Sequence, residues 1–338
     1  MTLSPPSFPH KKIQAKILFR TSEETETEFQ EASKYFDTTK YISDVKSGDL
    51  VIPRYSVLPF YKYVESEVEK LGGRLLNTYQ EHRYIANMHW VLELCDLTPR
   101  TWRNVGYRTV PDTPYGWVLK GATNSRKFNW NTHMYAKDRQ TLKDVYNKLM
   151  DDPMIAEQGI VFREYVPLVK LGENINGLNI SEEYRFFFVK NKIVASGFYW
   201  SNSDINIDVP EEATKFAKMA SEKIVDKVSA YVIDVGHTIA GEWIVIEVND
   251  FQMSGLSTIE PNMFYRSLYR IVVDLYGKIE GQVDSPPERA ALDDLYNAMN
   301  VFYSSDEAKI AALLKVIRPN ISHLRILEKA YLKLIGFD

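Results

Sequence analysis

The sequence predicts an α/β protein built from more than one lobe. Three patterns carry this prediction. Strand-like and helix-like segments alternate through the first part of the chain, which is typical of parallel α/β units. Two aromatic and β-branched runs then flank a short polar turn at 182–200, and this indicates a hairpin. A second hairpin pattern spans 231–248, and the full length of 338 residues leaves room for two or three domains.

The composition is that of an ordinary globular protein, with 45% apolar and 25% charged residues. The formal net charge of −4 argues against a protein built mainly to hold nucleic acid. A single cysteine, Cys95, excludes a disulfide within the chain, and we expect it in the core because it ends an apolar run. Residues 1–12 lack an apolar signal core and no run is long enough to span a membrane, so we expect a cytoplasmic protein with no membrane partner.

The first part of the chain reads as a small α/β domain with parallel strands. Apolar residues at helical spacing stop at Gly72-Gly73, and a Thr-Pro pair at 98–99 ends the last helix of this region. We therefore place the first domain boundary near residue 98. The expected strands are 13–19, 50–53 and 74–77, and the expected helices are 24–35, 60–71 and 82–97.

The middle of the chain alternates in the same way but carries more hairpin signals. A strand at 116–120 ends on Lys120, and a later strand at 159–166 is stopped by Pro167. A loop is expected at 168–179. Helices are expected at 137–150, 211–230 and 261–279.

The loop at 121–127 is rich in small, hydroxyl-bearing and basic residues. Such a loop can bind phosphate through backbone N–H groups and cations, here Ser125 and Lys127. It lacks the closing Gly-Lys-Ser/Thr of a Walker A motif. Two other interpretations stay open, namely a solvated hairpin tip and a basic, aromatic nucleic-acid surface that includes Phe128 and Trp130.

Glu183 and Arg185 lie two residues apart in an aromatic strand, so they share one face. The planar fork of an arginine suits phosphate or carboxylate, which makes an anion clamp one interpretation. The position alone favours the other interpretation, a structural ion pair between these two side chains.

Two acids and an amide interrupt the second hairpin. Glu247 and Asn249 project to the same side of one strand, and Asp234 comes alongside if the strands pair. Carboxylate and amide oxygens are the hard ligands that Mg²⁺ takes. The spacing therefore predicts a magnesium site, with solvent-facing acids at strand ends as the alternative.

The C-terminal part is expected to be helical after a linker at 284–287. The stretch 315–333 carries five Lys/Arg against one Glu. Such a stretch contacts a partner or polyanion in some proteins, but a solvated helix face is the plainer interpretation.

Taken in order, these segments resemble the ATP-grasp superfamily. The sequence is most similar to a small clade of ATP-grasp enzymes of bacteria and their viruses, which are thought to form amide bonds. The resemblance covers roughly residues 50 to 280 and depends on the order of the motifs rather than on any single one. The segments that carry it are 53–57, 75–77, 98–101, 120, 124–128, 163–168, 183–185, 234, 247–250 and 254–256.

The resemblance implies a fold and a reaction. The fold is an ATP-grasp fold with an N-terminal α/β pre-grasp domain at 1–98, an ATP-grasp domain at 99–282 and a helical C-terminal extension at 283–338. Within the second domain, the nucleotide lobe extends to about residue 166 and the metal and catalytic lobe follows it. The implied reaction is an ATP- and Mg²⁺-dependent ligation, in which a carboxylate becomes an acylphosphate, an amine attacks it, and ADP and phosphate are released.

The resemblance also implies roles for single residues. Lys120 resembles the lysine that grips the α/β phosphates, and Arg185 resembles the arginine beside the transferred phosphoryl group. Ser125 and Lys127 lie where the mobile phosphate-covering loop lies, with Arg126 as a further candidate. The remaining matches are Glu164, Tyr165 and Val166 for the adenine hinge, Glu183 for the nucleotide, and Asp234, Glu247 and Asn249 for Mg²⁺; catalysis is assigned to Arg185, Lys120 and Lys127.

The substrates are left open by the sequence. The expected partners are small-molecule or peptide carboxylates and amines, and the basic C-terminal helices leave nucleic acid open. Three alternatives to the ligase remain: a phosphotransferase, an enzyme of RNA ends and a nucleotide-binding module without turnover. Substrate candidates are Arg54, Tyr55, Asn77 and His82 in the first domain, and Asp250, Gln252 and Ser254 after the second hairpin.

Overall fold

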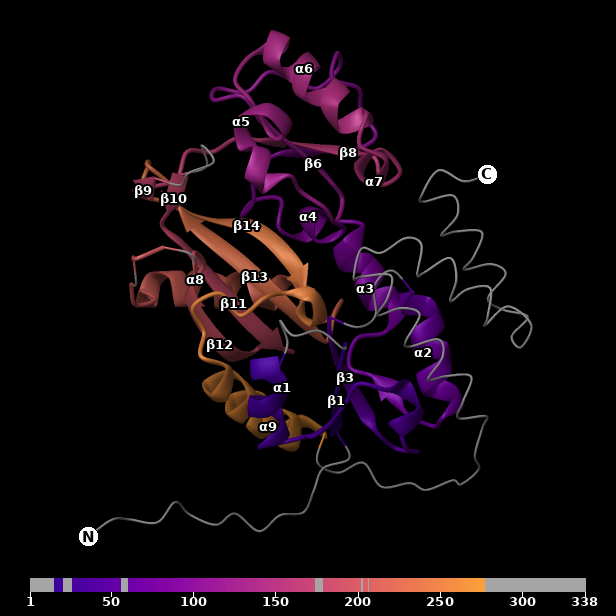
Figure 1. Cartoon of the computed structure of the whole chain (residues 1–338). Helices are drawn as coiled ribbons and strands as arrows, with labels where there is room; N and C mark the ends of the chain where they lie inside the picture. The colour runs from indigo at the N-terminus through magenta and orange to yellow at the C-terminus, as the bar shows by residue number, and fades with distance from the viewer. Residues whose placement is uncertain are drawn as a thin grey trace, which may run out of the picture.

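A computed structural model describes residues 15–20, 26–55, 60–173, 179–201, 203–205 and 207–276. The predicted helical extension at 283–338, with its basic stretch, lies outside these residues. The described part forms three four-stranded sheets and one two-stranded sheet. Figure 1 shows them following one another, from the sheet with β6 and β8 at the top, through the central β11–β14 sheet, to the sheet with β1 and β3.

The N-terminal sheet is parallel, as the sequence predicts. Its strand order is β2-β1-β3-β4, and each neighbouring pair is parallel. The two central strands are buried along their whole length, which is typical of a parallel sheet covered on both faces. The strands are β1 (Ala15–Phe19), β2 (Asp37–Thr39), β3 (Leu50–Arg54) and β4 (Arg74–Leu75).

The single helix expected at 82–97 is wrong, because the structure has two shorter helices there. Thr78 begins the first helix with a capping box to Glu81, and Met88 after its end has a φ of +53°, which turns the chain away. Cys95 follows the second helix and is exposed, so its predicted core position is also wrong. The helices of this region are α1 (Glu26–Ser33), α2 (Tyr61–Lys70), α3 (Tyr79–Ala86), α4 (Trp90–Glu93) and the 3₁₀ turn η2 (Ile42–Asp44).

The second sheet is antiparallel, with the order β5-β8-β6-β7. The helix α6 (Arg139–Met150) packs on it through Leu142, Val145 and Leu149, which share one face of the helix. The strands are β5 (Thr101–Trp102), β6 (Trp117–Gly121), β7 (Tyr135–Ala136) and β8 (Ile160–Glu164), with the short helices η3 (Lys127–Asn129), α5 (Trp130–His133) and α7 (Pro153–Ala156).

The stretch 168–179 is not only a loop, as the sequence analysis expects. It contains the strand β9 (Lys170–Glu173), which pairs antiparallel with β10 (Asn179–Ser181). The expectation fails because the segment lacks the alternating apolar pattern that marks a half-buried strand. This small sheet leads directly into the central one.

The central sheet has the order β12-β11-β13-β14 and contains both predicted hairpins. Alternate residues of β11 are buried on opposite faces: Phe186 and Phe188 pack with α8 and Phe187 packs with α9. Burial on both faces explains the unbroken aromatic run. The elements are β11 (Glu183–Val189), β12 (Lys192–Phe198), β13 (Ala230–His237), β14 (Trp243–Asp250), α8 (Glu211–Ile224), α9 (Pro261–Tyr276) and the 3₁₀ turn η4 (Phe251–Met253).

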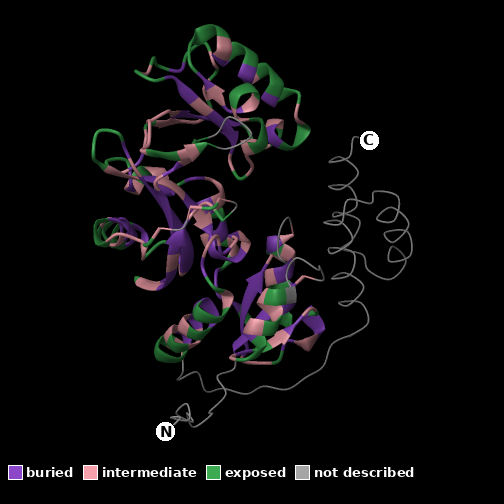
Figure 2. Cartoon of the chain, turned by 60° about the vertical axis from the view of Figure 1, so that its left-hand side comes forward, coloured by how far each residue is buried: buried purple, intermediate pink, exposed green. Residues whose placement is uncertain are grey.

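The largest core joins the N-terminal sheet to the central sheet. Ile17 and Ile52 of the first, Phe187 and Val232 of the second, and Phe264 of α9 belong to one buried cluster. Figure 2 shows the buried strands inside and the exposed helix faces outside. The shared core makes the N-terminal sheet a fixed wall beside the central one, while the domain boundary at 98 stays a prediction.

Candidate active site

The acids of the second hairpin lie together, as their spacing predicts. β13 and β14 pair with Asp234 directly opposite Glu247. The Nδ2 atom of Asn249 donates to Asp234 Oδ2 and to Glu247 Oε2, each over 3.1 Å. Three oxygen-bearing side chains therefore share one face of two rigid strands, and their role as metal ligands stays a prediction.

Arg185 pairs with Asp234 and not with Glu183, so the ion pair that the sequence favours is wrong. β11 lies beside β13 with Arg185 opposite Asp234. Arg185 Nε and Nη2 donate to the two carboxylate oxygens, each over 2.8 Å. Burial alone would lower the pKa of this arginine, but the Asp234 carboxylate raises it. Register between strands decides this pairing, and spacing within one strand does not reveal it.

Lys120 reaches across from the other sheet to Glu247. It lies on β6, is buried, and its Nζ forms an ion pair with Glu247 Oε1. Burial would raise the pKa of Glu247, but the charges of Lys120 and Lys127 hold it well below its ordinary value. The carboxylate is thus kept ionised between two lysines.

Glu183 is a buried carboxyl group that accepts a hydrogen bond from the Ser181 hydroxyl. Burial raises its pKa to about 7, and the hydrogen bond from Ser181 and the charge of Lys127 only partly oppose this. Glu183 therefore changes its charge near neutral pH.

The loop after β6 places two of its three polar candidates at the same pocket. Ser125 and Lys127 line it. Lys127 Nζ donates to the hydroxyl of Tyr199 over 2.5 Å. Arg126 instead donates to Asp152, with 2.6 Å between Nε and Oδ2, and is not among the side chains that line the pocket.

The segment after β8 lines the pocket as well, through Glu164, Tyr165 and Val166. Two of its backbone N–H groups are engaged inside the lobe: Glu164 donates to Arg100 O (2.8 Å) and Tyr165 to Gly116 O (3.0 Å). The Glu164 carboxylate also accepts from Arg100 Nε over 2.8 Å. The segment is thus held firmly beside the pocket.

The pocket lies between the second sheet and the central sheet and has a charged end and an apolar end. Lys120, Lys127, Glu183 and Glu247 form the charged end. Its further lining residues are Pro99, Val118, Ser125, Trp130, Met134, Arg163, Glu164, Tyr165, Val166, Leu168, Asn179, Ser181, Tyr199, Trp200, Ile244 and Ile246.

Two pocket residues are missed by the sequence analysis. Tyr199 follows β12 and contacts Lys127. Arg163 is buried, donates to Thr98 Oγ1 over 2.7 Å, and burial lowers its pKa to about 10. An arginine inside an apolar strand is a signal that was available for Arg163; Tyr199 offers none, because aromatic residues fill the whole hairpin.

The substrate candidates beyond β14 are engaged in structural contacts instead. The Asp250 carboxylate and His82 Nδ1 share a hydrogen bond of 2.7 Å, and the buried side chain of Gln252 contacts the Tyr61 hydroxyl. The ring of His82 stacks on Tyr61, with 4.3 Å between centroids. The Ser254 hydroxyl donates to the backbone oxygen of Asp250 over 2.8 Å. These residues join the central sheet to α2 and α3.

The candidates of the first domain form a second buried junction. Arg54 is fully buried and donates to Phe251 O (2.8 Å) and to Glu28 (3.0 Å). Tyr55 also contacts Glu28. Asn77 is fully buried and exchanges two hydrogen bonds with the backbone of Ala230. Their predicted contact with substrate is not supported by this burial, except for the half-buried Tyr55.

Comparison with known proteins agrees with the fold. Residues 110–268 match a family model described as an ATP-grasp domain, the third family of its clade. The chain carries an ATP-grasp domain. The predicted relationship to ATP-grasp ligases, the predicted ATP-grasp fold and the predicted enzyme class are confirmed by this match.

Solved structures with the ATP-grasp fold superpose on most of the chain. The D-cycloserine synthetase DcsG has a TM-score of 0.52 at 12% identity, covering 76% of this chain and 99% of its own. The ATP-grasp ligase PsnB, complexed with a phosphomimetic variant of minimal precursor, Mg and ADP, has a TM-score of 0.51 at 10% identity, covering 77% and 98%. At these identities the likeness shows the fold alone. No curated protein matches the sequence.

Proposed function

We propose that this ATP-grasp protein is an ATP- and Mg²⁺-dependent carboxylate–amine ligase, which forms an amide through an acylphosphate and releases ADP and phosphate. One observation carries the proposal. The pocket between the two sheets brings Lys120, Lys127 and Arg163 against Glu247, whose neighbours Asp234 and Arg185 extend the same charged cluster. Such a set binds a polyphosphate and balances charge as a phosphoryl group moves.

ATP fits the two ends of the pocket in one orientation. Val118, Met134 and Ile246 offer an apolar surface to adenine, next to the segment 164–166. Because the N–H groups of Glu164 and Tyr165 are engaged, contacts to the adenine edge fall to their carbonyl groups and to Val166. The phosphates then extend toward Lys120 and Lys127.

The carboxylate cluster fits Mg²⁺ by the chemistry of its donors. Among the described residues, no group of three or more His, Cys, Asp and Glu side chains could hold a metal, so the proposed set is two carboxylates and one amide. Asp234 and Glu247 are held ionised by cations, and the Asn249 amide contacts both. Mg²⁺ takes few protein ligands and completes its shell with phosphate and water, so Asp234, Glu247 and Asn249 suffice. When bound, it would neutralise charge on the transferred phosphoryl group.

The side chains of the pocket then have separate tasks. Lys120 and Lys127 bind phosphate oxygens from the side of the second sheet. Arg185, held by Asp234, presents its guanidinium group where negative charge develops during transfer. The loop 121–127 covers the site and excludes water, which protects an acylphosphate from hydrolysis.

The substrates of this ligase are an acid and an amine, and the acid is a small molecule or a peptide end. PsnB is described in complex with a precursor peptide, and DcsG is a D-cycloserine synthetase. Both substrate sizes thus occur on this fold. No helix among the residues described above is long and apolar enough to cross a membrane. A cytoplasmic location stays a prediction, and the RNA alternative depends on residues outside the described part.

Nucleotide turnover tests the proposal. The protein would be incubated with ATP, Mg²⁺ and pools of amino acids, polyamines and short peptides, with Glu247→Gln in parallel. We expect ADP and phosphate from one pool, together with a product whose mass is the sum of two components less water. AMP and pyrophosphate as products would refute the ligase mechanism, and Mg²⁺-dependent ATP binding without turnover in any pool would favour the non-catalytic module.

A further inference from the structure

Tyr199 lies at the charged end of the pocket, directly after β12. It is half-buried and lines the pocket. Its backbone N–H donates to the backbone oxygen of Glu183 over 3.0 Å, and its ring makes an edge contact with Trp200, with 5.3 Å between centroids. The side chain is therefore held in place by the central sheet and not by the loop that it contacts.

Two cations from opposite walls meet on this one ring. Lys127, from the loop after β6, donates to the Tyr199 hydroxyl over 2.5 Å and has its Nζ 4.8 Å from the ring centroid. Arg185, from β11, has its guanidinium carbon 4.8 Å from the same centroid. Tyr199 thus joins the phosphate-covering loop to the strand that carries the catalytic arginine.

The two lysines of the site are held in different ways. Lys120 forms an ion pair with Glu247, whereas Lys127 is held by a phenol. A neutral hydroxyl orients an ammonium group without cancelling its charge, so an arriving phosphate replaces it readily. A side chain that is already oriented loses less conformational freedom when it binds, and this favours binding.

We propose that Tyr199 is a positioning residue of this site: its hydroxyl orients Lys127 toward the nucleotide phosphates, and its ring supports Arg185 on the opposite wall. The inference rests on the proposed function and adds to it the residue that sets the two cations relative to each other. It also explains why the loop 121–127 stays close to the central sheet without help from Arg126, which is paired with Asp152.

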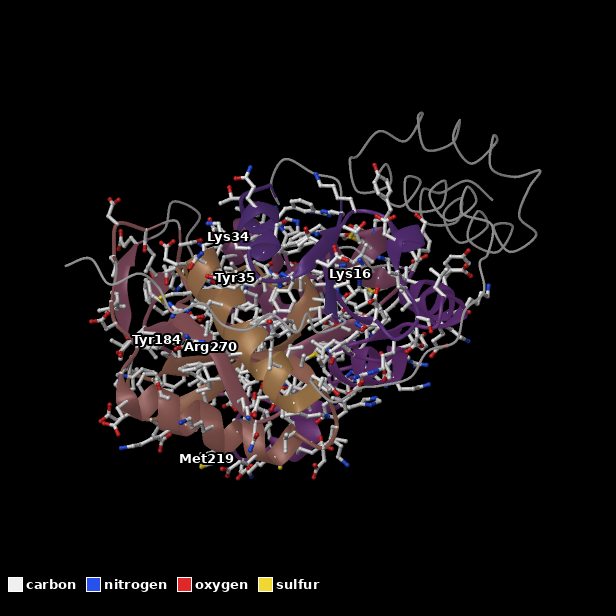
Figure 3. The ribbon with its side chains drawn as sticks, turned by 90° about the horizontal axis from the view of Figure 1, so that it is seen from below. Lys16, Lys34, Tyr35, Tyr184, Met219 and Arg270 are labelled. Atoms are coloured by element: carbon white, nitrogen blue, oxygen red, sulfur yellow. The ribbon has the colours of Figure 1, made fainter. Side chains whose placement is uncertain are left out.

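Two substitutions separate the two contacts. Tyr199→Phe removes the hydroxyl and keeps the ring under Arg185, whereas Tyr199→Leu removes both. Tyr35→Phe is the matched control, because the Tyr35 hydroxyl also donates one side-chain hydrogen bond, to Asn262 over 3.1 Å, but on the outer surface. Figure 3 shows Tyr35 beside α9.

Steady-state ADP release and nucleotide binding measure the effect. For Tyr199→Phe we expect the KM for ATP to rise about fivefold to tenfold with kcat within about twofold of wild type, because only binding of the phosphates is weakened. For Tyr199→Leu we expect the same rise in KM and a further loss of about tenfold in kcat. A purely structural role would lower the melting temperature of both variants and change KM and kcat in parallel.

Trypsin gives a second readout that needs no turnover. It cleaves after Arg126 and Lys127, so a loop released by Tyr199→Phe should be cut faster than in wild type and in Tyr35→Phe. Kinetics and cleavage equal to those of Tyr35→Phe, in a preparation whose wild type turns over ATP, would overturn the inference alone. A wild-type protein that binds no ATP with Mg²⁺ would overturn the proposed function and this inference together.

Discussion

Asp234 and Glu247 face each other across neighbouring strands, and a nitrogen of Asn249 lies 3.1 Å from a carboxylate oxygen of each. Each acid is also paired with a cation from another strand, Asp234 with Arg185 and Glu247 with Lys120. The cluster therefore joins both walls of the pocket. Its charges are balanced before any ligand arrives, and a polyphosphate with its metal would redistribute these pairs.

The first prediction concerns Glu247. Glu247→Gln keeps the shape of the side chain and removes its charge, so we expect ADP release to fall by at least about 100-fold. The fold should survive, because Lys120 keeps an oxygen acceptor. Glu242→Gln, on the exposed turn before β14, is the control and should behave as wild type. Wild-type ADP release by Glu247→Gln would remove this residue from the metal site.

The second prediction concerns the pair between Arg185 and Asp234. Asp234 is 1% exposed, so Arg185→Met leaves a buried carboxylate without its cation. We expect a loss of about 3–5 kcal/mol in the free energy of unfolding, measured in urea. Mg²⁺ should restore part of it, since the metal supplies the missing positive charge. Arg270→Met on the exposed face of α9 is the control (Figure 3), and equal effects of Mg²⁺ on both variants would contradict the metal site.

The third prediction uses the raised pKa of Glu183. Burial raises this pKa from 4.5 to about 7 in the folded protein, so between these values the folded state holds a proton that the unfolded state has released. Stability then falls as the pH rises through this range and levels off above it. Glu183→Gln lacks this dependence. The difference in unfolding free energy between wild type and Glu183→Gln should therefore shift against wild type from about pH 5 to pH 8; a constant difference would show that Glu183 titrates normally.

The fourth prediction concerns the junction between the first domain and the central sheet. Arg54 is fully buried and pairs with Glu28, which also accepts from Tyr265 over 2.7 Å. Arg54→Met leaves Glu28 without its cation and should destabilise more than Glu28→Gln. A double-mutant cycle in urea should give a coupling energy of about 1–3 kcal/mol between the two residues. Additive effects would show that the pair is not energetically linked.

The sequence predicts the central hairpins and their acids well, because side-chain alternation in a strand decides which residues share a face. The spacing of Glu247 and Asn249 places them together, and the pairing of two apolar strands brings Asp234 alongside. The parallel pairing of the first sheet follows equally from its buried, β-branched strands.

The contacts between strands and lobes are beyond the reach of such patterns. Arg185 pairs with Asp234 because β11 lies next to β13 in one register, and nothing in its own strand encodes that neighbour. Lys127 meets Tyr199 only after two sheets are packed together. Asp250 and His82 look like substrate ligands in sequence, but they contact each other at a buried junction.

The helix expected at 82–97 fails for a local reason. Its apolar spacing continues past Asn87, but Met88 adopts a left-handed conformation that reverses the chain. Cys95 consequently lies on the surface instead of in the core. Periodicity detects the helical residues but not the single backbone angle that divides them.

Trapping the acylphosphate with hydroxylamine tests the central claim most directly. Hydroxylamine replaces the unknown amine, so wild type with ATP, Mg²⁺ and pooled carboxylic acids or peptides should release ADP and form an equal amount of hydroxamate. Glu247→Gln should form neither. Release of AMP and pyrophosphate, or ADP formation with the phosphate transferred to a hydroxyl group and no hydroxamate, would contradict the proposal that this protein activates a carboxylate for amide formation.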